Sequence, residues 1–478
     1  QTPLYDMLLS FAASKDDPIS GGRHKVLGSK ALSIPPQTST IASHLPKAMG
    51  AAFSIPLAER IKAEQKKILA KDPLKINEET VVTEDLTERK VTEDMLGNIP
   101  KDSIIVCNFG DASSNHSTTQ GAINSTAWAA YQSIPMPIVF VCEDNGIGIS
   151  TSTPKGWVAA NYQHRAGINY IYCDGLNILD TYQKAKQAEE LARKRHKPVF
   201  LHMRTVRLLG HAGSDAEFVY RKMKDIEDNE FQDPLLHSAR ILLENEILTA
   251  EKIIEIYQNI EHKVAEIAQQ VIHRPKLVTA EQVKASIVPE NNNLAELTKH
   301  YHPVSEVQRA HIFAHEKHNL PKKQHLAKLI NWTLMDLMAE HQNMLMCGED
   351  IAKKGGVYNV TAKLSERFGK NRVINTLLDE QSILGLAIGM AHNGYLPIPE
   401  IQFLAYVHNA EDQIRGEAAT LSFFSNSQFT NPMVIRIAGL AYQKGFGGHF
   451  HNDNSFAVFR DIPGLIIACP SNGADAVE

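Results

Sequence analysis

Oxygen-bearing side chains follow two short apolar runs near the middle of the first half of the chain. Residues 104–109 run into Asp111, and residues 137–142 run into an acidic, glycine-containing turn that includes Asn145. Continuous apolar runs of this length are typical of buried parallel strands. A carboxylate, a side-chain amide and the carbonyls of a turn are ligands that Mg²⁺ accepts together with phosphate oxygens. The pattern therefore predicts a site for a metal and a phosphorylated ligand.

The segment between these runs, residues 119–132, has helical composition and length. It predicts a unit of strand, turn, helix and strand, with the two strands parallel and both turns at the same edge of the sheet. Open α/β sheets bind ligands at that edge. A second interpretation stays open, in which Asp111 caps the following helix and Asn145 adopts a left-handed turn conformation.

Together the two turns resemble the thiamine-diphosphate fingerprint, which begins Gly-Asp-Gly and ends in Asn-Asn. Here it stands as Gly110-Asp111-Ala112 and Asp144-Asn145. The resemblance implies that Asp111, Asn145 and the backbone carbonyl of Ile147 hold the Mg²⁺ that bridges the diphosphate of the cofactor. Ala112 and Asp144 depart from the motif, and the interval is somewhat longer than usual, but no metal ligand is lost.

Further residues of the first half match the decarboxylating components of 2-oxo acid dehydrogenases. The segment before the fingerprint implies that Ser39 and Ile41 line the cofactor, and its small residues would let a helix start approach a phosphate or simply pack tightly. The Arg-x-x-x-His loop implies that Arg207 meets the diphosphate. In the same loop, His211 would meet the cofactor and the acceptor lipoyl group. Ala212 stands where related mammalian proteins carry a regulatory phosphoserine, although Ser214 is close by.

The second half resembles the other subunit of the same enzymes, which contributes the pyrimidine-binding domain. Glu380 matches the glutamate that hydrogen-bonds the aminopyrimidine ring and activates the cofactor, and its alternative role is that of an acid at a helix start, after a capping Asp379. Gln402 and Tyr406 correspond to cofactor and substrate-pocket positions, and His451 to the second active-site histidine.

Length and composition set the expected architecture. A chain of 478 residues, 43% apolar and 22% charged, predicts two or three globular domains. The resemblance implies an α/β fold with two thiamine-diphosphate-binding-type domains, each a parallel sheet flanked by helices, in a transketolase-like architecture. The domains are residues 1–290, which bind diphosphate and Mg²⁺ and carry a charged insertion at 61–102, and residues 326–478, which bind the pyrimidine. Residues 291–325 are predicted to be a linker. We expect a piece of a longer polypeptide, without the C-terminal domain of the second subunit.

Net charge limits the classes of binding partner, and cysteine placement indicates the redox state of the thiols. A net charge of -5 with acids and bases interspersed gives no basic surface for nucleic acid or anionic membrane, and no apolar run is long enough to span a bilayer. The five cysteines are scattered, and four lie in or beside apolar runs, which predicts reduced core thiols. We expect a cytoplasmic protein.

The resemblance implies oxidative decarboxylation of a 2-oxo acid, with the acyl group passing to lipoamide on a partner dihydrolipoamide acyltransferase. Branched-chain 2-oxo acids are the first expectation and pyruvate the second. A homodimer of fused chains would place the two halves of each cofactor site together. Two alternatives stay open: a transketolase-like or deoxyxylulose-phosphate-synthase-like enzyme without a lipoyl partner, and a non-enzymatic remnant that no longer binds the cofactor.

Overall fold

The computed structural model describes residues 2–71, 99–288, 301–440 and 447–478. These residues form two compact units. Unit 1 comprises residues 1–52, 102–288 and 421–429, and unit 2 comprises residues 53–101, 289–420 and 430–478. Three stretches lie outside the described residues: most of the charged insertion, the start of the predicted linker, and residues 441–446 before His451.

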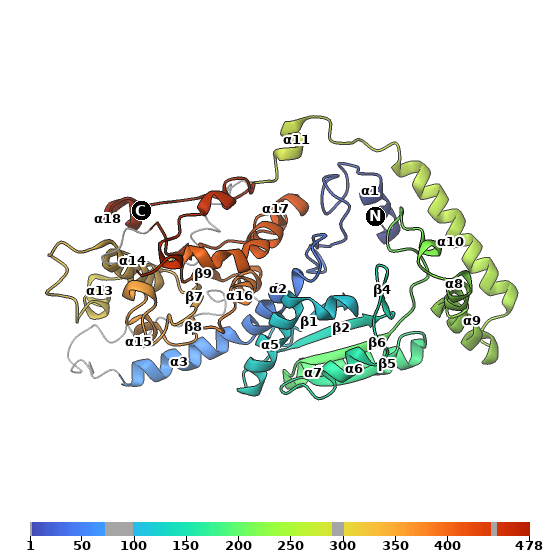
Figure 1. Cartoon of the computed structure of the whole chain (residues 1–478), viewed down its shortest axis with the longest axis horizontal. Coiled ribbons are helices and arrows are strands. Elements are labelled where there is room, and N and C mark those ends of the chain that lie inside the picture. Colours follow the sequence, from blue (N-terminus) through green and yellow to red (C-terminus); the bar gives the residue numbers. More distant parts are fainter. Residues whose placement is uncertain (1, 72–98, 289–300, 441–446) are drawn as a thin grey trace. The chain divides into compact units, whose positions relative to one another are not determined.

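Unit 1 is built on a four-stranded parallel sheet in the order β1-β2-β6-β5 (Figure 1). Strands β1 (Ile105–Gly110) and β2 (Ile138–Asp144) pair in register, and α5 (Ser117–Tyr131) connects them. Strands β5 (Asn169–Asp174) and β6 (Val199–Arg204) complete the sheet, with α7 (Ile178–Arg195) between them in sequence. The predicted strand, turn, helix and parallel strand are thus confirmed.

The expectation that both apolar runs are buried is wrong for the first. Strand β2 lies between two neighbours and buries Ile138 to Cys142, whereas β1 lies at the edge of the sheet among the described strands. Val106 of β1 is 59% exposed. An apolar run does not reveal whether a strand is central or at an edge, because the number of neighbours is a tertiary property.

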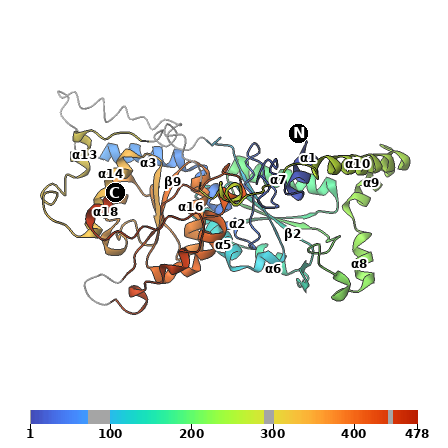
Figure 2. The same cartoon turned by 90° about the horizontal axis from the view of Figure 1, so that it is seen from above.

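The two faces of this sheet carry different side chains. One face packs Val139, Val141 and Leu201 against α7, through its small residues Ala188 and Ala192. The other face carries aromatic rings: those of Phe200 and Tyr162 stack with centroids 4.1 Å apart, and Phe109 meets both Phe140 and Phe200 edge-on. Tyr162 comes from α6 (Trp157–Tyr162), which lies with α5 on the side opposite α7 (Figure 2).

Unit 1 contains further elements besides this sheet and its helices. They are α1 (Pro3–Phe11), α2 (His44–Ser54, which crosses the boundary to unit 2), the hairpin of β3 (Ile147–Gly148) and β4 (Thr151–Ser152), the single turns Ala112–Asn115 and Glu217–Val219, α8 (Met223–Glu230), α9 (Pro234–Glu244), α10 (Ala250–Val271), α11 (Ala280–Lys284) and α17 (Leu421–Phe424).

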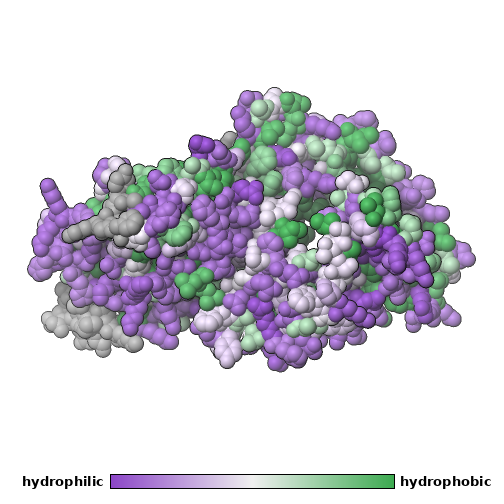
Figure 3. Space-filling model, in the orientation of Figure 1, coloured by the Kyte–Doolittle hydropathy of each residue, from purple (hydrophilic) through white to green (hydrophobic). Residues whose placement is uncertain are grey.

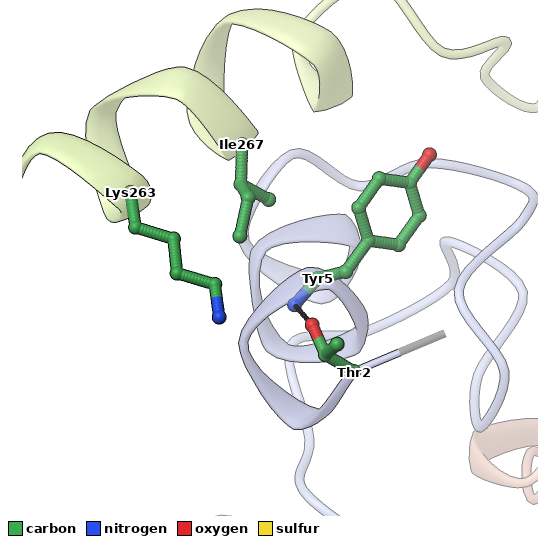
Figure 4. A pocket seen from close by; sticks show the side chains of 4 residues that line it. All are labelled: Thr2, Tyr5, Lys263 and Ile267. Atoms are coloured by element: carbon green, nitrogen blue, oxygen red, sulfur yellow. Dashed lines mark hydrogen bonds between the residues drawn. The ribbon is translucent and has the colours of Figure 1, made fainter. Parts of the chain in front are cut away.

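Helices α1 and α10 pack together through Leu9, Ile267 and Val271. A shallow pocket of about 340 Å³ lies beside this contact, lined by Thr2, Tyr5, Lys263 and Ile267 (Figure 4). None of the residues predicted to act in chemistry lines it. On the face drawn in Figure 3, small hydrophobic areas are interspersed with hydrophilic ones.

Unit 2 has its own four-stranded parallel sheet, in the order β10-β9-β7-β8. Its strands are β7 (Met344–Gly348), β8 (Val373–Asn375), β9 (Leu396–Ile401) and β10 (Arg436–Ile437). The other elements are α3 (Leu57–Lys71), α13 (Glu306–Ile312), α14 (Leu326–Glu340), α15 (Leu364–Phe368), α16 (Glu380–His392), α18 (Gly473–Val477) and the short turns Val357–Asn359, Leu404–Asn409, Gln413–Ala418, Phe450–Asn452 and Phe456–Phe459.

Helix α16 is the central helix of unit 2. Every residue from Ser382 to Ala391 is buried, and the helix packs on β7 and β9. A helix that is apolar all round is buried on all sides. Its first residue, Glu380, is therefore held at the end of a rigid element.

The stretch predicted as a linker contains a helix and a buried aromatic residue. Its residues 306–312 form α13, and Phe313 is 2% exposed in the core cluster of unit 2, where its ring meets Trp332 edge-on. Single aromatic anchors in a polar stretch give little periodicity, so sequence reasoning finds them with difficulty.

Two further expectations concern the cysteines and membrane-spanning segments. Cys107, Cys142, Cys173 and Cys347 are buried free thiols, as predicted, and Cys469 is exposed. Among the described residues, no helix has both the length and the apolar content that crossing a bilayer demands.

Candidate cofactor-binding and catalytic sites

Asp111 lies directly after β1 and is 1% exposed. Its side chain accepts a hydrogen bond from the Thr153 hydroxyl and does not cap the turn that follows it. Burial raises the pKa of Asp111, with a smaller upward contribution from Asp144, whereas the Thr153 hydrogen bond opposes the rise. Of the two interpretations of Asp111, the helix cap is therefore not what the structure shows.

The turn after β2 is fixed by its own side chains. The Asn145 side-chain oxygen accepts from the Ile147 N–H at 3.1 Å, and Asp144 accepts from the Gly146 N–H at 3.1 Å. The left-handed residue of this turn is Gly146, with φ +76°, rather than Asn145. Thr153 N–H closes the hairpin by donating to the Gly146 carbonyl at 2.9 Å. Asp111, Asn145 and Ile147 thus come from adjoining turns at one edge of the sheet.

The fit between Ala112 and Gly148 accounts for one departure from the fingerprint. A Cβ atom built on Gly148 would clash with the methyl group of Ala112. The alanine is therefore accommodated because residue 148, across the turn, has no side chain.

The N-terminal segment reaches the same strand. The His44 ring nitrogen Nε2 lies 2.8 Å from the Asn108 carbonyl oxygen of β1, which brings the start of α2 to this strand. Ser39 and Ile41 precede α2 and are exposed. Both residues lie near the start of that helix.

Arg207 connects its loop to the hairpin. Its guanidinium donates to the Ile149 carbonyl at 2.6 Å, to Glu217 at 2.6 Å and to the Tyr220 hydroxyl at 2.8 Å. Burial alone would raise the pKa of Glu217, but hydrogen bonds from Arg207 and Arg221 lower it. Arg207 thus contacts the hairpin at Ile149, two residues after Ile147.

His211 is exposed in the same loop. Its backbone N–H donates to Asp215 at 2.7 Å, and the Tyr220 hydroxyl donates to that carboxylate at 2.6 Å. These bonds fix the loop backbone and leave the His211 imidazole at the surface. Ala212 and Ser214 are exposed beside it.

The metal ligand set of unit 1 is mixed. Among the described residues, no group of three or more His, Cys, Asp or Glu side chains could hold a metal ion. The candidate ligands are instead the buried Asp111 carboxylate, the Asn145 amide oxygen and the Ile147 carbonyl. They offer one charge and several neutral oxygens, which suits Mg²⁺ shared with a phosphate. The residues present therefore fit a Mg²⁺-diphosphate group.

In unit 2, Glu380 is the first residue of α16, after the N-cap Asp379. Asn409 donates to the Glu380 carboxylate at 2.9 Å and to Asp379 at 3.4 Å. Asp379 makes no side-chain hydrogen bond to the helix N–H groups and instead accepts from the Ser382 hydroxyl. The acid cap expected in the alternative interpretation is therefore not formed through the Asp379 side chain.

Glu349 was not among the predicted site residues. It follows β7, is 7% exposed, and its pKa is raised to about 7 by burial and then by Glu380, Asp350 and Asp379. These four carboxylates form the acidic cluster of unit 2. A carboxyl group with such a pKa exchanges a proton near neutral pH.

Aromatic rings lie beside the second predicted histidine. The His451 ring meets Phe403 edge-on at 4.5 Å between centroids, and Tyr406 at 6.3 Å. Phe403 and Tyr406 lie in the segment that follows β9, and Gln402 is the first residue after that strand. The structure thus brings His451, Tyr406 and Phe403 together, with Gln402 adjacent in sequence.

Residues that sequence reasoning missed include Thr153, which hydrogen-bonds Asp111, and Asn409, which hydrogen-bonds Glu380. They also include His202, which hydrogen-bonds Asp144, and Glu349 of the acidic cluster. His202 is a polar residue within the buried strand β6, and a polar side chain inside an apolar run was the one available signal. Thr153 and Asn409 had none, because their role depends on contacts distant in sequence.

Comparison with known proteins identifies the families that the two halves of the chain match. Residues 2–279 match the family described as "Dehydrogenase E1 component", and residues 322–478 match "Transketolase, pyrimidine binding domain". The "2-oxoisovalerate dehydrogenase subunit beta" of Bacillus subtilis is 38% identical over 148 residues, 31% of this chain and 44% of that protein. The "3-methyl-2-oxobutanoate dehydrogenase subunit beta" of Mycobacterium tuberculosis is 34% identical over 152 residues, 32% of this chain and 43% of that protein.

A third relative, the "Pyruvate dehydrogenase E1 component subunit beta" of Staphylococcus aureus, is 36% identical over 156 residues, 32% of this chain and 46% of that protein. The chain thus spans less than half the length of these relatives. A solved transketolase from Leishmania mexicana is 14% identical with a TM-score of 0.49, over 92% of this chain and 57% of that chain.

The first match covers more than half of the chain, and the second accounts for the independent parallel sheet of unit 2. The expected α/β fold with two parallel sheets flanked by helices is confirmed. The chain belongs to the dehydrogenase E1 component family and carries a transketolase-type pyrimidine-binding domain in the same polypeptide.

Proposed function

We propose that this chain is the thiamine-diphosphate-dependent decarboxylating component of a 2-oxo acid dehydrogenase, with two subunits fused. The observation that carries the proposal is the set of oxygens at the end of the unit 1 sheet, where a buried Asp111 with a raised pKa adjoins Asn145 and Ile147. A bound cation offsets the cost of ionising a buried carboxylate.

We assign the diphosphate and its Mg²⁺ to Asp111, Asn145 and the Ile147 carbonyl, with Gly110 and Ala112 at the turn and Arg207 facing the phosphates. Ser39 and Ile41 are proposed to line the cofactor. When bound, the cofactor supplies a nucleophilic carbon and an electron sink for decarboxylation.

In unit 2, Glu380 is proposed to hydrogen-bond the aminopyrimidine ring and hold a proton there. Asn409 orients its carboxylate through the 2.9 Å hydrogen bond. Gln402 and Tyr406 are assigned to the cofactor and substrate pocket. His451, held between Phe403 and Tyr406, binds the substrate carboxylate and moves a proton, and His211 serves the cofactor and the acyl acceptor.

The substrate is proposed to be a branched-chain 2-oxo acid, with pyruvate as second choice. Two of the relatives above are named for 2-oxoisovalerate or 3-methyl-2-oxobutanoate and one for pyruvate. The aromatic rings beside His451 suit an aliphatic substituent.

The acyl acceptor, the assembly and the location complete the proposal. The acceptor is lipoamide on a partner dihydrolipoamide acyltransferase, and the assembly is a homodimer in the cytoplasm. The diphosphate- and Mg²⁺-binding domain is proposed to be residues 1–290, and the pyrimidine-binding domain residues 326–478.

The test is decarboxylation of 3-methyl-2-oxobutanoate and pyruvate with an artificial electron acceptor, in the presence of thiamine diphosphate and Mg²⁺. We expect turnover of both acids, faster with the branched one, and none with Glu380→Gln. A second arm offers lipoamide or an aldehyde as acyl acceptor. Transfer to the aldehyde alone would favour the transketolase-like alternative, and absence of cofactor binding would favour a non-enzymatic remnant.

A further inference from the structure

Asp144, the residue that replaces the first Asn of the fingerprint, ends a hydrogen-bonded chain across three neighbouring strands. Its Oδ2 atom lies 2.7 Å from His202 Nε2 on β6. The other ring nitrogen of His202, Nδ1, lies 2.6 Å from the Tyr170 hydroxyl on β5. The three side chains share the aromatic face of the sheet with Phe200, since Tyr170 also stacks on that ring.

Burial gives these bonds a direction. His202 is 5% exposed, and burial raises the pKa of Tyr170 to about 12, so the phenol keeps its proton. The hydroxyl therefore donates to Nδ1, and the Nε2–H donates to Asp144. An aspartate carboxylate offers only acceptor atoms, so Asp144 accepts this hydrogen bond.

Asp144 in turn fixes the backbone on both of its sides. Its other oxygen accepts from the Gly146 N–H at 3.1 Å, and its backbone carbonyl accepts from the Thr205 N–H at 2.7 Å. Asn145 and Ile147, which follow, are the residues assigned to the metal. The side chain that holds this turn is thus itself held by the buried His202, which the half-buried Tyr170 contacts in turn.

We propose that Tyr170, His202 and Asp144 form a positioning relay that sets the turn at residues 144–147 for binding of the Mg²⁺-diphosphate group. The proposal rests on the function proposed above. Outer-shell hydrogen bonds orient metal ligands, and their loss typically weakens binding by about 10- to 100-fold. The relay also accounts for the aspartate, because two N–H groups point at this side chain and a carboxylate can accept from both, whereas an amide has one acceptor atom.

The test uses His202→Leu, which removes both hydrogen bonds, and Tyr170→Phe, which removes only the outer one. Tyr172→Phe is the matched control, because the Tyr172 ring also meets His202 edge-on, at 5.3 Å, without a hydrogen bond between them among the described contacts. Three quantities are measured on each full chain: the dissociation constant of thiamine diphosphate with Mg²⁺ by calorimetry, the hydrogen exchange of the Gly146 and Thr205 amides without cofactor, and the melting temperature.

We expect His202→Leu to weaken cofactor binding by about 10- to 100-fold and to speed exchange of both amides. Tyr170→Phe should weaken binding by about 2- to 10-fold, the equivalent of one hydrogen bond, and Tyr172→Phe should match wild type. A His202→Leu protein that melts lower yet keeps wild-type affinity and amide exchange would overturn the relay, as would equal affinities for the two tyrosine variants. If wild type itself does not bind thiamine diphosphate with Mg²⁺, the proposed function fails and the relay falls with it.

Discussion

The two parallel sheets of this chain both place carboxylates after their strands, but the neighbours of these carboxylates differ. At the unit 1 sheet, Asp111 accepts from Thr153 and Asp144 accepts from His202. At the unit 2 sheet, Glu349 is buried beside three other carboxylates, and their charges add to burial in raising its pKa to about 7.

We infer from this difference that the unit 1 carboxylates serve binding and the unit 2 carboxylates serve proton transfer. The hydrogen bond from His202 keeps Asp144 ionised and fixes its turn. Burial raises the pKa of Asp111, and a bound cation would favour the charged form of this carboxylate. Carboxylates that crowd one another keep a proton available near neutral pH, which suits a site that protonates and deprotonates a bound ring. We therefore propose that unit 1 holds the metal and the diphosphate and that unit 2 exchanges a proton with the bound ring.

The largest expected effect is that of Glu380→Gln on the proton-exchanging site. Glutamine keeps the volume and can still hydrogen-bond, but it cannot hold the charge that stabilises a protonated ring. Turnover should fall by about 10²- to 10⁴-fold, while cofactor affinity changes little. The measurements are 2-oxo acid decarboxylation and exchange of the cofactor C2 proton, followed by NMR.

Glu366→Gln is the matched control for that variant. Glu366 also lies in the first turn of a helix, α15, but it is exposed. If Glu380 only favoured the helix dipole, both variants would cost about 0.3 to 1 kcal/mol of stability and leave turnover intact. Near-wild-type exchange and decarboxylation in Glu380→Gln would refute its assignment.

Asp111→Ala should break the fixed site. The change removes a charged metal ligand at a strand end and little core volume, so we expect the fold to persist and Mg²⁺-dependent cofactor binding to weaken by more than about 100-fold, beyond the loss of an outer-shell group. Calorimetry measures the affinity, and circular dichroism checks the fold. Asp228→Ala, an exposed acid of α8, is the control, and unchanged affinity in Asp111→Ala would remove the metal assignment.

Glu349→Gln tests the raised pKa in unit 2 through the pH dependence of stability. The folded pKa of Glu349, about 7, lies above its unfolded value, so folding favours the protonated form and wild type loses stability as pH rises between the two values. The loss is complete above pH 7 and amounts to up to about 3 kcal/mol. The variant should therefore match wild type near pH 4 and be more stable at pH 8, as measured by urea unfolding. A constant difference across this range would contradict the raised pKa.

The smallest effect tests how Ala112 fits the fixed site. Gly148→Ala should destabilise by about 1 to 3 kcal/mol because the new methyl group meets that of Ala112. Adding Ala112→Gly should recover most of the loss. Thermal unfolding of the two single variants and the double variant gives the coupling, and strictly additive changes would show that the two residues do not compete for space.

Local patterns predicted the parts of the fold that depend on local chemistry. The apolar runs around 104 and 137, the helix between them and the acid-and-amide turns follow from composition and periodicity, and the structure confirms these elements. The edge position of β1 was missed because burial of a strand depends on its neighbours. Phe313 was missed in the same way, since one buried ring leaves no periodic trace in a polar stretch.

The candidate sites show the same limit. Asp111 and Glu380 could be found from motifs, whereas Asn409, Thr153 and Glu349 could not. Thr153 lies 42 residues from Asp111, and Asn409 lies 29 residues from Glu380. Such contacts depend on the order of the strands in each sheet, and that order cannot be read from any single stretch of sequence.

The most direct test of the central claim is calorimetric titration of the wild-type chain with thiamine diphosphate, once with Mg²⁺ and once with the metal chelated, with unphosphorylated thiamine as the matched ligand. If the unit 1 turns hold a metal-bridged diphosphate, thiamine diphosphate should bind with Mg²⁺, bind far more weakly without it, and thiamine should bind weakly in both conditions. Equal affinity with and without the metal, or equal affinity for thiamine and its diphosphate, would contradict the account.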